Sequence, residues 1–70
     1  MDQVETLADA LPKEMARVRE VLGHYKEIGT AGAIGAAFIE HDLRNADRAS
    51  ASGEVVAMLD ALVTLRGIKG

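Results

Sequence analysis

The sequence predicts an all-α protein in which a short N-terminal helix is followed by three main helices that form helical hairpins. Apolar residues recur at intervals of three or four positions over most of the 70 residues, as they do along one face of a helix. No segment shows the strict alternation of apolar and polar residues that is typical of a half-buried strand. Turn signals fall at Gly29 and at the segment 50–53, which separates the main helical stretches.

The composition predicts that one copy of the chain needs a partner to complete its core. A chain of 70 residues lies near the lower limit for independent folding, and small domains usually add disulfides, a metal or another subunit. The chain contains no cysteine, and His24 and His41 stand without a metal-ligand pattern. Tyr25 and Phe38 are its only aromatic residues. We therefore expect a homo-oligomeric helical bundle with no metal and no cofactor.

Two helices are predicted before the first turn. The residues Val4, Leu7, Ala8 and Leu11 have helical spacing, and Asp2 is placed to cap a leader helix over 1–11. Pro12 fits the first position of a second helix, where its missing N–H costs nothing, so this helix is predicted over 12–28. Its apolar face consists of Met15, Val18, Val21, Leu22, Tyr25 and Ile28.

A third helix is predicted over 30–51. Gly29 can adopt the left-handed conformation that ends the preceding helix, and the Thr30 hydroxyl can accept the first free N–H groups of the next. One face collects mostly small residues: Gly32, Gly35, Ile39, Leu43, Ala46 and Ala49. Asp42 and Asn45 project into the apolar sector beside Phe38, where polar groups must be paired. A structural role at a seam between subunits is the favoured interpretation of these two residues.

The last helix is predicted over 53–66, with residues 67–70 as a tail. Ser52 is a plausible cap, and the Glu54 carboxylate is favourably placed in the first turn. Apolar side chains cover more than half of the circumference of this helix, which exceeds the needs of one contact within the chain: Val55, Met58, Leu59, Leu62, Val63 and Leu65. Part of that surface is expected to face another subunit.

The run of glycines at positions 29, 32 and 35 indicates that backbone approaches something very closely, either another helix or a ligand. The run matches neither a dinucleotide fingerprint nor a triphosphate-binding loop. Free N–H groups at a helix N-terminus still attract anions in general. A residue near this turn can contact a ligand through a hydroxyl, a positive charge, an aromatic ring or an accessible backbone N–H. The candidate ligand-binding residues are therefore Tyr25, Lys26, Thr30, Gly32 and Arg44. Tyr25 also lies on the apolar stripe and is more typical of a core residue.

Several function classes are disfavoured. The formal net charge of −3 argues against nonspecific nucleic-acid binding, which requires a basic face. No segment reaches the roughly 18 continuous apolar residues of a membrane span, and no signal peptide is recognised, so we expect a cytoplasmic location. Ser50 and Ser52 are remote in sequence from both histidines, and the pair His41-Asp42 lacks further metal ligands. We therefore expect no enzymatic activity.

The passage from Val21 to Leu65 resembles small uncharacterised helical proteins encoded by bacteriophages and prophages. The resemblance rests on Tyr25-Lys26-Glu27-Ile28-Gly29, on the glycine and alanine pattern of 32–36, and on the segment 52–59, Ser-Gly-Glu-Val-Val-Ala-Met-Leu. Accessory proteins of this kind commonly act without catalysis in the host cytoplasm. They block a host defence protein or sequester a signalling nucleotide between subunits.

Two hypotheses follow from the sequence. In the first, a homo-oligomer sequesters a small phosphorylated ligand, such as a cyclic nucleotide, at its subunit boundaries. In the second, the protein is an interaction module whose acidic helical surface occupies a basic patch on a host defence protein.

Overall fold

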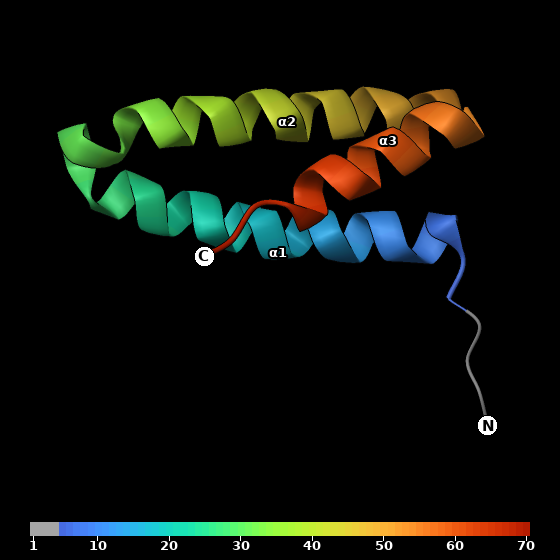
Figure 1. Cartoon of the computed structure of the whole chain (residues 1–70), viewed down its shortest axis with the longest axis horizontal. Helices are drawn as coiled ribbons and strands as arrows, with labels where there is room; N and C mark the ends of the chain where they lie inside the picture. Colours follow the sequence, from blue (N-terminus) through green and yellow to red (C-terminus); the bar gives the residue numbers. More distant parts are fainter. Residues whose placement is uncertain (1–4) are drawn as a thin grey trace.

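The computed structural model describes residues 5–70 and contains helices and no strand in this range. Helix α1 spans Leu7–Glu27, the 3₁₀ turn η1 spans Gly29–Gly32, α2 spans Ala33–Ser52 and α3 spans Val55–Arg66. The helices α1 and α2 form an antiparallel hairpin, and α3 returns from the end of α2 to pack on both (Figure 1). The predicted all-α class is confirmed.

The first long helix is continuous through Pro12, which differs from the predicted boundary between a leader helix over 1–11 and a helix over 12–28. Thr6 caps α1: its hydroxyl accepts from the Asp9 N–H at 3.2 Å. Proline at this position removes one backbone hydrogen bond, to the Ala8 carbonyl. The start predicted at Asp2 lies outside the described residues.

Burial explains why this proline does not end the helix. Leu7, Leu11, Met15 and Val18 form one uninterrupted apolar stripe across it, and Leu11 and Val18 are fully buried. Packing of that stripe outweighs the local cost of proline, because most helical stability in a protein comes from tertiary contacts.

The turn between α1 and α2 uses glycine as predicted but is capped differently. Gly29 has a φ of +81°, the left-handed conformation expected for the residue that ends α1. Thr30 does not cap the next helix, because residues 29–32 form the turn η1 and α2 begins three residues later than predicted. The N-cap of α2 is Gly32, which makes no side-chain capping bond.

The joint between α2 and α3 centres on Gly53, whose φ of +70° ends α2. Ser52 is the last residue of α2 rather than part of the next helix. Its hydroxyl donates to the Ala49 carbonyl at 2.8 Å and accepts from the Glu54 N–H at 3.1 Å. Glu54 is the N-cap of α3, so α3 begins two residues later than predicted.

The core lies between the three helices and is built from aliphatic side chains and alanine. Its buried members are Ala10, Leu11, Met15, Val18, Val21, Ile39, Leu43, Ala46, Leu62 and Leu65. No polar or charged residue in the described part of the chain is buried. The predicted small-residue face of α2 is confirmed as its inward side at Ile39, Leu43, Ala46 and Ala49.

A guanidinium group ties the end of α3 to α1. The Arg17 Nη2 atom donates to the Leu65 and Ile68 carbonyl oxygens, each at 2.9 Å, and also to the Glu14 carboxylate at 2.9 Å. The last carbonyls of a helix have no partner within the helix itself. Arg17 therefore adds a side-chain donor to the Leu65 carbonyl, which also accepts from the Ile68 N–H, and ties the end of α3 to α1.

Candidate functional site

The glycines of the hairpin turn are packed against Tyr25 of α1. A methyl group on Gly32 would collide with the Tyr25 carbonyl oxygen, and one on Gly35 would lie 2.5 Å from the Tyr25 Cε2 atom. The ring of Tyr25 is partly buried against the core. The close backbone approach indicated by the sequence is therefore a contact between two helices of one chain at these two positions.

A shallow hollow of about 430 Å³ lies beside this turn and contains two of the predicted ligand-binding residues. Lys26 and Thr30 both line it, together with Gly29, Ala33, Ala36, Ala37 and Glu40. Gly32 is covered by Tyr25, and neither Tyr25 nor Arg44 is among the lining residues. The structure thus brings together part of the predicted set.

Glu40 is the residue of this hollow that sequence reasoning missed. Its Oε2 atom lies 3.0 Å from the Lys26 Nζ atom, in a pair that is substantially exposed to solvent. Residues 26 and 40 are equally distant from position 33, so an antiparallel hairpin turning near 33 brings them side by side. An anion entering the hollow would have to compete with this carboxylate for the ammonium group.

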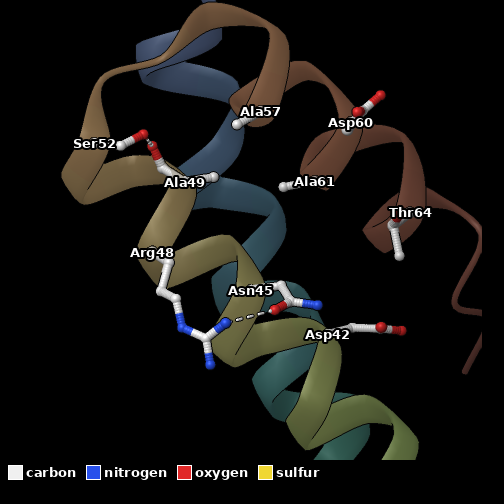
Figure 2. Close-up of a pocket in the computed structure, with 9 residues that line it drawn as sticks. All are labelled: Asp42, Asn45, Arg48, Ala49, Ser52, Ala57, Asp60, Ala61 and Thr64. Atoms are coloured by element: carbon white, nitrogen blue, oxygen red, sulfur yellow. Dashed lines mark hydrogen bonds between the residues drawn. The ribbon is translucent and has the colours of Figure 1, made fainter.

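A second concavity, a groove of about 480 Å³, separates α2 from α3. It is lined by Asp42, Asn45, Arg48, Ala49, Ser52, Ala57, Asp60, Ala61 and Thr64. Figure 2 shows Arg48 turned toward Asn45 and away from α3, and the Arg48 Nη1 atom donates to the Asn45 Oδ1 atom at 3.2 Å.

The groove corrects the expectation that Asp42 and Asn45 lie in an apolar sector. Asn45 is exposed, Asp42 is half-buried, and the Phe38 side chain beside them is 68% exposed. Asp42 has a neighbour in His41, with 3.6 Å between Oδ1 and Nδ1. Among residues 5–70, no three His, Cys, Asp or Glu side chains are grouped so that they could hold a metal ion.

Seven large apolar side chains are exposed on the surface of residues 5–70. α3 is 12 residues long and α2 is 20, so α3 covers only the end of the hairpin far from η1 (Figure 1). The end near η1 exposes Ile28, Ile34 and Phe38, and α3 itself exposes Val55, Val56, Leu59 and Val63. We name these seven residues the stepped face, because α3 forms its raised part and the hairpin end its lowered part.

Helical periodicity places both parts of the stepped face on one side of the molecule. At 100° per residue, Phe38 shares its side of α2 with Asn45 and Ala49, which line the groove to α3. Ile28 likewise shares its side of α1 with Arg17, which contacts the end of α3. On α3, Val56, Leu59 and Val63 lie about 140–160° from Ala61, which packs toward the core, and Val55 lies about 120° from it.

This arrangement confirms that the apolar surface of α3 is wider than one contact within the chain requires. Leu62 and Leu65 are buried and Met58 is half-buried, while Val55, Leu59 and Val63 remain at least half exposed.

Within residues 5–70, no helix combines the length and the apolar character needed to cross a lipid bilayer.

Comparison with known proteins found no family model, no curated protein and no solved structure that matches this chain. The resemblance to phage-encoded proteins therefore stays a prediction from the sequence.

Proposed function

We propose that this protein acts by binding another protein, without catalysis, and that the stepped face is its binding surface. The observation that carries the proposal is the exposure of seven large apolar side chains, each between 51% and 74% exposed. Single exposed apolar residues are ordinary, but seven large ones on one side of a small domain are typical of an interaction site.

Other features of the described residues agree with a binding role. In the groove between α2 and α3, the Ser52 hydroxyl is used by the backbone of Ala49 and Glu54, so it supports the turn rather than a reaction. Four of the ten acidic side chains between residues 5 and 70 are paired with lysine or arginine: Glu5 with Lys13, Glu14 with Arg17, Glu40 with Lys26 and Asp47 with Arg19. The proposal relies on the exposed apolar side chains and not on the acidic surface that the sequence suggested.

The proposal is tested by changing the stepped face and measuring capture. Two differently tagged copies are expressed together, cross-linked in cells and purified, so that both a second copy and an unrelated protein are detected by quantitative mass spectrometry. The double variant Phe38→Ser/Val63→Ser is expected to lose the captured partner. The matched control Arg44→Ser/Thr64→Ser changes the same two helices outside the stepped face and is expected to retain it. Equal capture by both variants would refute the proposal.

Sequestration of a small phosphorylated ligand is the second candidate function, because Lys26 and Thr30 line the same hollow. Cyclic and linear nucleotides at millimolar concentration are the probes, and the change in melting temperature is the readout. Glu40→Gln is expected to increase the shift, since it frees the Lys26 ammonium, and Lys26→Ala to abolish it. Lys13→Ala is the control, because Lys13 pairs with Glu5 away from the hollow. No shift with wild type or Glu40→Gln would remove this candidate.

A further inference from the structure

We infer that the occupant of the stepped face is a second copy of this chain. The inference rests on the proposed function and names the partner. Two copies would be related by a two-fold axis, with α3 of each copy seated over the hairpin end of the other. Most homo-oligomers have closed symmetry, and a two-fold interface requires a surface that is complementary to itself.

The shape of the stepped face meets this requirement. α3 stands above one end of the hairpin, residues 67–70 continue along α1 as far as Val21, and in the described part of the chain no helix covers the end near η1 (Figure 1). Consider a two-fold axis that lies at the step between α3 and the uncovered hairpin end, perpendicular to the long axis of the hairpin and parallel to its plane. Rotation about this axis turns a second copy over and exchanges its two ends. The raised α3 of each copy then lies above the lowered hairpin end of its neighbour.

The apolar stripe of α3 and the uncovered segment of α2 have the same length. The exposed apolar residues of α3 run from Val55 to Val63, about 12 Å along the axis at 1.5 Å per residue. The groove places Asp42 beside Thr64 near the end of α3, so the uncovered part of α2 runs from Ala33 to His41. This segment has the same number of residues as the apolar stripe, so one fits along the other.

The amount of apolar surface also fits a dimer. At roughly 100 Å² of exposed area for each large side chain, the seven residues supply about 700 Å² per copy. A stable interface of standard size uses about 800 Å² from each partner. In the two-fold arrangement Phe38 of one copy is expected near Leu59 of the other. The seven residues of the stepped face are the large apolar side chains that the described residues expose.

Cysteine cross-linking tests the arrangement directly, since the chain has no cysteine of its own. Phe38→Cys and Leu59→Cys change exposed residues, so the core is left intact. When the two single variants are mixed and oxidised, a disulfide between Phe38→Cys and Leu59→Cys chains is expected to dominate over links between identical chains. Glu20→Cys mixed with Leu59→Cys is the control and is expected to stay unlinked. Self-linking of Leu59→Cys as the main product would overturn the inference.

The mass in solution supplies the second measurement. Light scattering at micromolar concentration is expected to give twice the 7.4 kDa of one chain, and Phe38→Ser/Val63→Ser is expected to give 7.4 kDa. A single-chain mass for wild type would overturn the inference. If the stepped face still controls capture of a different protein in that case, the proposed function survives. If capture also fails to depend on the face, both are refuted.

Discussion

Contacts with Tyr25 explain why glycines occupy the turn between α1 and α2. Its carbonyl oxygen lies against Gly32 and its ring against Gly35, so both glycines are required by a neighbour in the same chain. The spacing of the glycines in the sequence predicted a close approach of backbone. The spacing did not identify the neighbour, because a helix and a ligand can each approach the backbone closely only where the side chain is absent.

The contact predicts opposite effects for two glycine-to-alanine changes. Gly32→Ala is expected to destabilise the fold by about 1–3 kcal/mol, because the blocking atom is a backbone carbonyl that cannot rotate away. Gly23→Ala is the matched control: open space surrounds Gly23 in α1, and alanine is the better helix former by about 1 kcal/mol. Urea unfolding followed by circular dichroism measures both. A stabilised Gly32→Ala variant would show that the turn is more loosely packed than described.

The helices show which parts of the fold the sequence could predict. The inward faces of α1 and α2 follow from the 3.6-residue period, which depends only on which residues are apolar. The boundary at Pro12 was predicted wrongly, because proline is a local signal, whereas the stripe from Leu7 to Val18 is buried by residues distant in sequence. The start of α2 was missed for a similar reason: Thr30 is a good cap, but the tight approach to Tyr25 places the residue in η1.

The candidate sites were less predictable than the helices. Lys26 and Thr30 share a hollow as their sequence proximity suggests, whereas Arg44 lies outside its lining residues. Arg44 is 14 positions after Thr30, a distance of about 20 Å along a helix, so charge alone gave no reason to group them. α3 ends at Arg66, the residue predicted from the sequence. The stepped face depends on which end of the hairpin α3 packs over, and no pattern within α3 encodes that placement.

Arg17 should control how firmly α3 is held. Arg17→Met keeps the apolar stem but removes the donors to the Leu65 and Ile68 carbonyls. Amide hydrogen exchange in the last turns of α3 is expected to become faster, and exchange in the middle of α1 to change little. Arg19→Met is the control, because the Arg19 pair with Asp47 is longer, at 3.7 Å, and solvent-exposed. Equal exchange in the two variants would contradict a capping role for Arg17.

The same cluster predicts a dependence of stability on pH. The hydrogen bond from Arg17 lowers the pKa of the Glu14 carboxyl in the folded protein below its ordinary value of 4.5. A group whose pKa is lower in the folded state adds stability above its unfolded pKa, and that stability is lost as the pH falls through the folded pKa. The free energy of unfolding should therefore decrease below about pH 4.5.

Glu14→Gln separates this contribution from that of other carboxylates. Urea unfolding at pH 7 and at pH 3 should show a smaller difference for Glu14→Gln than for wild type. The control Glu20→Gln should behave as wild type does. An unchanged pH dependence in Glu14→Gln would place the acid sensitivity elsewhere in the chain.

The whole molecule is thin for its length. Its radius of gyration is 12.9 Å, against about 11 Å for a compact chain of 70 residues, and its shortest extent is 16 Å. Three helices of unequal length enclose a narrow core and leave one end of the hairpin uncovered. A second copy would thicken the molecule where it is thinnest, which is the physical reason that stability and assembly should be linked.

This link predicts a melting temperature that rises with protein concentration. Anything that binds only the folded chain stabilises it by mass action, and a second copy does so in proportion to its own concentration. Wild type measured by differential scanning calorimetry over a hundredfold range of concentration should show the increase. Phe38→Ser/Val63→Ser should melt at one temperature throughout. A wild-type melting temperature that is independent of concentration would contradict the link.

The two turns of this chain differ in how well they should tolerate substitutions and insertions. At Gly32 a neighbouring carbonyl fills the space that an added atom would need, whereas the space around Gly53 is open and only the left-handed φ of +70° restricts that residue. A grafted loop or a fused peptide should therefore be accepted at the second turn and rejected at the first. In diverging descendants of this sequence, length variation should accumulate beside position 53, while positions 25, 32 and 35 should vary only in concert.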